Sequence, residues 1–208
     1  MYHGEKLNSI THLAGAALSL VGLGALLTVS ISEQDPRMIV SFSIFGVSLV
    51  VLYTMSTLYH SFQPPNLKKL FQKLDHTAIY FLIAGSYAPY ALVSLKDGPG
   101  ATILAIVCSL AVVGILLDLL IPRRIEVLQL LIYLSMGWLA ALEFSSLKAA
   151  IPLAGFTWLC LGGTAYTGGV IFYILDDHHH FPHAHGIWHL FVMLGSVCTF
   201  ISIIGYVR

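Results

Sequence analysis

Three histidines in this sequence have the spacing of a hydrolytic metal site. His185 and His189 are four residues apart in an apolar segment, which places both imidazoles on one side of a helix. His60 ends another apolar segment. Three imidazole nitrogens would fill three positions of a tetrahedral zinc ion (Zn²⁺) and leave the fourth position open for water. Because zinc lowers the pKa of such a water to about 7, the pattern predicts hydroxide at neutral pH.

Two oxygen-bearing side chains would complete this chemistry. Asp75 opens the segment after His60, where its carboxylate would hold and deprotonate the water. Ser56 lies one helical turn before His60, where its hydroxyl would steady the water or a developing oxyanion. Two plainer interpretations stand beside these. A lone HxxxH pair is also typical of interfacial histidines whose tips reach water, and Ser56 would then bond to the carbonyl of Leu52, four residues earlier.

Other polar residues receive structural interpretations. We expect His76 to be interfacial, because it points about 100° away from Asp75 around a helix. We expect Asp118 to satisfy charge near Arg123 and Arg124. Four further histidines precede the last apolar segment, and we expect them to lie in a solvated loop outside the main site. They are His178, His179, His180 and His183.

Seven apolar segments position these residues. The chain has 208 residues, of which 57% are hydrophobic and 10% charged, whereas roughly 25% are charged in a typical soluble domain. A membrane-spanning helix needs about 20 mostly apolar residues. Segments of that length, separated by charge or proline, cover residues 10–31, 38–61, 70–94, 101–121, 127–147, 153–175 and 185–207. The sequence therefore predicts an all-α membrane protein, with one seven-transmembrane-helix bundle over residues 1–208.

Short loops make neighbouring helices antiparallel, so the helix ends that carry the candidate site reach one face of the membrane. That face bears the N-terminus, and it receives six basic residues: Lys6, Lys68, Lys69, Lys73, Arg123 and Arg124. The other face receives four, namely Arg37, Lys96, Lys148 and Arg208. This difference favours a cytoplasmic N-terminus and an outside C-terminus. The formal net charge of zero gives no basic field for nucleic acid, and the three cysteines, all in apolar runs, form no disulfide framework.

Four motifs, in order along the chain, resemble those of the hemolysin III family, the bacterial branch of the progestin and adipoQ receptor (PAQR) proteins. They are ExxNxxxH at Glu5, Asn8 and His12, SxxxH at Ser56 and His60, Lys73-Leu-Asp75-His-Thr followed by Gly85-Ser-Tyr-Ala-Pro89, and HxxxH at His185 and His189. The resemblance implies a seven-helix bundle with one zinc near the cytoplasmic side. It also implies that the zinc is held by His60, His185 and His189. By the same resemblance, Asp75 binds the zinc through water, and Ser56 lies beside the zinc. For Glu5, Asn8 and His12 we expect a structural network that ties the first helix to that end, and the alternative for His12 is that it touches the site.

On these grounds we expect a multi-pass protein of the cell inner (plasma) membrane that hydrolyses an amide or ester bond of a membrane lipid with zinc. The resemblance adds a wider superfamily that contains ceramidases. A sensor or receptor of membrane state with structural zinc is the alternative, and it would need a site closed by four protein ligands. A secreted cytolysin or pore is disfavoured, because seven spans would stay in the producing membrane. A zinc transporter is disfavoured as well, because the polar residues gather at one face.

Overall fold

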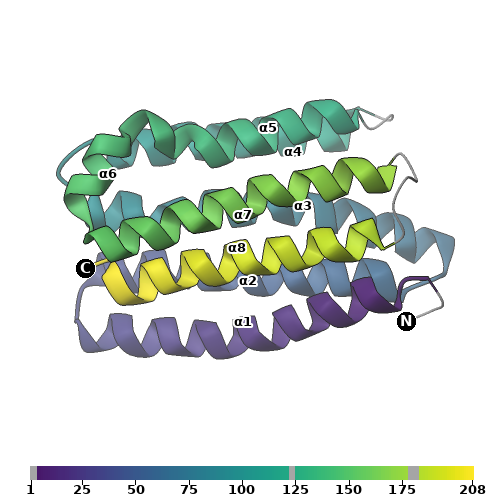
Figure 1. The fold of residues 1–208 in the computed structure, drawn as a ribbon, viewed down its shortest axis with the longest axis horizontal. Coiled ribbons are helices and arrows are strands. Elements are labelled where there is room, and N and C mark those ends of the chain that lie inside the picture. Colours follow the sequence, from purple (N-terminus) through teal and green to yellow (C-terminus); the bar gives the residue numbers. More distant parts are fainter. Residues whose placement is uncertain (1–3, 122–124, 178–182) are drawn as a thin grey trace.

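A computed structural model of the chain describes residues 4–121, 125–177 and 183–208. Every regular element in those three ranges is a helix, and the long helices lie side by side along one axis (Figure 1). In chain order the elements are α1 (Lys6–Ser32), α2 (Pro36–Ser61), α3 (Pro65–Pro89), the π-helix η1 (Tyr90–Ser94), α4 (Gly100–Leu120), α5 (Glu126–Trp138), the 3₁₀-helix η2 (Leu139–Glu143), α6 (Phe144–Ala150), α7 (Leu153–Asp177) and α8 (Ala184–Tyr206).

Seven helical segments among the described residues are long and apolar enough to cross a membrane, which confirms the predicted fold class. The third span, Pro65–Ser94, differs most from its prediction, because it begins at Pro65 and not at residue 70. Proline suits the first helical position, where its missing N–H would have no partner in the helix. Polar residues therefore extend this helix beyond the apolar run. The predicted break before α2 is confirmed too, since the Asp35 side chain accepts a hydrogen bond from the backbone N–H of Arg37 at 2.8 Å.

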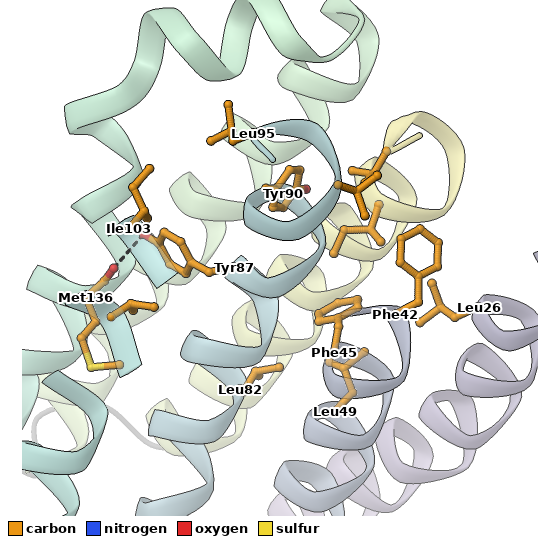
Figure 2. Packing of buried hydrophobic residues seen from close by; sticks show 14 of the residues in the cluster. Leu26, Phe42, Phe45, Leu49, Leu82, Tyr87, Tyr90, Leu95, Ile103 and Met136 are labelled. Atoms are coloured by element: carbon orange, nitrogen blue, oxygen red, sulfur yellow. Dashed lines mark hydrogen bonds between the residues drawn. The ribbon is translucent and has the colours of Figure 1, made fainter. Parts of the chain in front are cut away.

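The fifth span is interrupted, whereas the sequence predicts one continuous run. Here α5 gives way to η2 and then α6, and the Tyr87 hydroxyl from α3 lies at the change. That hydroxyl donates to the carbonyl of Met136 at 2.7 Å (Figure 2). It also donates to the carbonyl of Gly137 at 3.0 Å and accepts from the backbone N–H of Ala140 at 2.9 Å. Backbone that departs from the α-helical hydrogen-bond pattern at membrane depth needs such partners, because lipid offers none.

The interior is packed with large apolar side chains from several helices (Figure 2). Three of these side chains are 0% exposed, namely Leu26 of α1 and both Phe42 and Phe45 of α2. Other large apolar side chains point outward, such as Leu120 at 74% exposed, which is the arrangement expected when lipid covers the bundle. At Gly162 of α7, an added Cβ would lie 2.8 Å from the Thr199 Oγ1 of α8, so this glycine allows α7 and α8 to approach closely.

The two termini lie at opposite ends of the bundle (Figure 1). The start of α1 lies at the same end as the end of α2, the start of α3 and the start of α8. These are the helix ends that carry the candidate site. The alternation of helix directions therefore gathers them as the sequence predicts.

Candidate metal centre

Three histidines from two helices converge at the N-terminal end of the bundle. His60 lies in the last turn of α2, and His185 and His189 lie in the first turns of α8. One ring nitrogen of each lies within 4.8 Å of the corresponding atoms of the other two, which is close enough for all three to bind one metal ion. His60 is 2% exposed and His189 is 0% exposed, whereas His185 is half-buried.

The Nδ1 atom of each imidazole contacts an oxygen on another residue. His60 Nδ1 lies 2.7 Å from Glu5 Oε2, and His185 Nδ1 lies 2.9 Å from Asp176 Oδ2. Carboxylate partners of this kind fix the tautomer and orientation of metal-binding histidines in proteins. Their acceptor oxygens place the Nδ1 proton toward the carboxylate and leave the Nε2 lone pair for another partner.

The tautomer of His189 follows from the bonds of Thr11. Thr11 Oγ1 lies 3.3 Å from His189 Nδ1, and the same hydroxyl donates to the carbonyls of Leu7 at 2.9 Å and Asn8 at 3.0 Å. A hydroxyl has only one proton, so its contact with His189 must use an oxygen lone pair. His189 Nδ1 therefore carries a proton, and its Nε2 is left with a lone pair.

The Nε2 atoms of all three histidines are buried and have no hydrogen-bond partner within the described ranges. Three such lone pairs close together, without a donor between them, are unfavourable unless a cation or a water lies among them. Imidazole nitrogens with oxygen partners on the far side of the ring are ligands that zinc commonly takes. The described residues therefore fit a divalent metal with three nitrogen ligands.

Glu5 connects α1 to this cluster. Its Oε2 accepts from Asn8 Nδ2 at 2.8 Å as well as contacting His60, and its Oε1 accepts from Lys68 Nζ at 3.2 Å. Burial acts to raise the pKa of the Glu5 carboxyl, but hydrogen bonds from His60 and Asn8, together with the charge of Lys68, hold that pKa well below its usual range. Glu5 therefore remains a carboxylate that supports His60.

The expected network of Glu5, Asn8 and His12 is only partly correct. Glu5 and Asn8 are bonded, but the His12 ring stacks against His189, with ring centroids 3.6 Å apart. Asn8 and His12 are one turn apart, yet they face different partners, because His12 lies deeper between α1 and α8.

Asp75 and Ser56 line a large cavity, and Ser56 lies one turn before His60 on α2. Asp75 is 7% exposed and Ser56 is 1% exposed, and both face a cavity of about 480 Å³ that is otherwise mostly apolar. The Asp75 carboxylate is not one of the groups that lie within 4.8 Å of one another in the histidine cluster. In the described part of the chain, Ser56 makes no hydrogen bond to the Leu52 carbonyl, so the plainer interpretation of Ser56 is not met.

The other polar residues have simpler surroundings. His183 caps the start of α8 with φ 65°, and it does not belong to the histidine cluster. Asp118 accepts a hydrogen bond from Gln129, which the sequence did not suggest. Three of the histidines predicted to be solvated lie outside the described residues, namely His178, His179 and His180. The predicted basic partners of Asp118, Arg123 and Arg124, also lie outside them.

Sequence reasoning missed two partners of the histidine cluster. Asp176 lies at the end of α7, nine positions before His185, and Thr11 lies on α1. A carboxylate near the end of an apolar helix, just before a histidine pair, is a signal that would have pointed to Asp176. Thr11 carried no such signal, because a threonine in a membrane helix usually bonds to its own backbone.

Comparisons with known proteins agree with these motifs. The model of the family described as haemolysin-III related matches residues 1–200. The chain is 40% identical over 203 residues to Hemolysin-3 of Bacillus cereus, which covers 98% of this chain and 91% of that protein. It is 42% identical over 202 residues to a Hemolysin-3 homolog of Bacillus subtilis, and the match covers 97% of this chain and 93% of that protein. The human monocyte to macrophage differentiation factor is 33% identical to this chain over 170 residues, and the match covers 78% of this chain and 68% of that protein. The chain is a multi-pass membrane protein that belongs to the haemolysin III family.

Proposed function

We propose that this protein is a zinc-dependent hydrolase that cleaves an amide or ester bond of a membrane lipid. The observation that carries the proposal is the convergence of three buried Nε2 lone pairs beside an apolar cavity. The metal would be held by His60, His185 and His189. Zinc bound there would supply a Lewis acid with a position open to water.

The open position distinguishes a hydrolytic site from a structural one. Structural zinc is normally closed by four protein ligands, whereas a catalytic site keeps three and leaves one position free. Within the described ranges the cluster offers three nitrogen ligands. This number supports the hydrolase over the sensor with structural zinc.

Asp75 and Ser56 would act on the proton and the carbonyl oxygen. Asp75 would accept the proton of the attacking water and deliver it to the nitrogen or oxygen of the leaving group. Ser56 would donate a hydrogen bond to the substrate carbonyl oxygen as negative charge develops on it. Both side chains line the cavity wall, so they would meet a substrate that enters there.

The cavity supports a lipid as the substrate. Its volume of about 480 Å³ lies in the usual range for small-molecule sites, and its apolar lining suits an acyl chain. We propose that the N-terminal end faces the cytoplasm, because that face receives more lysine and arginine. The site would then meet lipids of the inner leaflet of a bacterial inner membrane.

The test combines metal analysis with a lipid panel, on wild type and His189→Ala purified in detergent. His183→Asn is the matched control, because it removes a nearby imidazole outside the cluster and asparagine tolerates the positive φ. We expect one zinc per chain in wild type and control, loss of zinc in His189→Ala, and release of free fatty acid only by the zinc-loaded proteins. Full zinc occupancy without cleavage of any amide or ester lipid would refute the hydrolase. Absence of zinc, or retention in His189→Ala, would refute the metal site.

A further inference from the structure

Tyr53 connects the two helices that carry the histidine cluster. It lies on α2 and is 2% exposed, and its hydroxyl donates to Ser196 Oγ of α8 at 2.7 Å. The same hydroxyl lies 3.4 Å from the carbonyl oxygen of Val192, one turn earlier on α8. A buried hydroxyl is costly without a partner, so this contact favours one arrangement of α2 relative to α8.

The contact has the same spacing from the metal ligands along both helices. Tyr53 lies seven residues before His60 on α2. Ser196 lies seven residues after His189 on α8, and seven residues are about two helical turns. The rings of the two histidines have their centroids 4.9 Å apart. Because the end of α2 and the start of α8 lie at the same end of the bundle (Figure 1), the tyrosine contact lies two turns deeper than the histidine contact, in the same register.

Backbone packing does not set that register directly. Among the described residues, α2 packs against α1 and α3, and α8 packs against α7 and α1. The backbones of α2 and α8 come close at very few points within the same ranges. The metal ligands therefore bridge two helices that are not packed on each other, and long side chains must hold these helices at the required distance.

The surroundings of the Tyr53 ring fix its position. At Gly15 of α1, an added Cβ would lie 2.7 Å from Tyr53 Cδ1, so a larger residue there would displace the ring. The ring meets the edge of His12 with centroids 5.0 Å apart and an interplanar angle of 83°. At the hydroxyl end, Ser196 Oγ also contacts the Tyr166 hydroxyl of α7 at 2.8 Å. The ring is thus held against α1 at one end and bonded to α8 at the other.

This position separates Tyr53 from the proposed chemistry. Ser56, one turn away on α2, lines the cavity, but Tyr53 is not among the described residues that do so. Its hydroxyl is directed to Ser196. Tyr53 can therefore act on the metal centre only through the helices that it connects.

We propose that Tyr53 is a positioning residue for the metal centre, because its hydrogen bond to Ser196 fixes α8 relative to α2 with the histidine nitrogens within reach of one ion. This inference rests on the metal site of the proposed function. In the metal-free protein the bond favours the arrangement in which ligands from both helices already converge. Preorganisation of this kind raises affinity, because the ion does not have to bring the helices together.

Zinc competition titrations on Tyr53→Phe and Tyr90→Phe test this. Tyr90 is the matched control, because its buried hydroxyl donates to Ser202 Oγ of α8 at 2.8 Å but comes from the third span and not from α2. Both variants should lower the thermal midpoint of the metal-free protein by similar amounts. Only Tyr53→Phe should weaken zinc binding, by about three- to tenfold, which is the factor that one net hydrogen bond contributes to an equilibrium constant.

A double-mutant cycle checks that the bond itself is responsible. Ser196→Ala removes the acceptor, so the double variant should bind zinc no more weakly than the weaker single variant. If Tyr53→Phe does not fold, Ser196→Ala takes its place against the same control.

The possible results separate the positioning role from the metal site. Zinc binding by Tyr53→Phe within about twofold of wild type overturns the positioning role and leaves the metal site standing. Equal losses of zinc affinity in Tyr53→Phe and Tyr90→Phe overturn it in favour of a general loss of stability. Absence of zinc from the wild type overturns both the positioning role and the proposed function.

Discussion

Replacing Glu5 by alanine should weaken metal binding, although Glu5 is not a ligand. Glu5 Oε2 lies 2.7 Å from His60 Nδ1, and its removal leaves that imidazole without the carboxylate that sets its tautomer. Asn8 and Lys68 lose the same partner. Partners of this kind typically contribute about 10–100-fold in metal affinity. Because three contacts disappear together, we expect Glu5→Ala to lie near a hundredfold loss, which is about 2.8 kcal/mol.

Glu5→Gln should fall near the lower end of that range. Its amide oxygen still accepts from His60, but the negative charge and the ion pair with Lys68 are lost. The assay is a zinc competition titration against a chromophoric chelator, with each protein in the same detergent. Glu33→Ala is the control, because Glu33 pairs with Arg208 at 3.3 Å at the other end of the bundle. If Glu5→Ala binds zinc within threefold of the wild type, the support assigned to Glu5 is refuted.

Three other outcomes follow from the contacts. Asp176→Asn should weaken zinc binding less than Glu5→Ala, because the Asp176 side chain is 43% exposed and water can replace it beside His185; the same titration measures this. Tyr87→Phe should lower stability by about 1–3 kcal/mol, seen as a lower thermal midpoint at unchanged zinc content, because backbone groups at the break in the fifth span lose their partner. The lowered pKa of the Glu5 carboxyl means that its stabilisation is present above the ordinary value of 4.5 and is lost as pH falls below it. The difference in thermal midpoint between metal-free wild type and Glu5→Gln should therefore shrink from about pH 6 to about pH 3, and a constant difference would contradict this.

The sequence by itself determined the seven spans and the end of the bundle at which the polar residues gather. Lipid cannot satisfy backbone groups, so each long apolar run must be helical, and its length must match the bilayer. Alternating helix directions then bring His60 to the same end as His185 and His189, whatever the packing. The spacing of the HxxxH pair needs no tertiary information, because four residues return to the same side of a helix.

Only the tertiary structure decided which atoms meet. Thr11 and Asp176 orient two of the histidines from other helices. The place of Asp176 just before the histidine pair is a sequence signal, but nothing in the sequence indicates the contact between Thr11 and His189. Whether His12 joins Glu5 or stacks on His189 depends on the depth and rotation of α1 against α8, which hydropathy does not specify. The break in the fifth span likewise depends on the Tyr87 hydroxyl from α3. Hydropathy fixes where a helix must lie, because that depends on transfer from water to lipid, but side-chain partners depend on packing between helices, which are equally apolar on their outer faces.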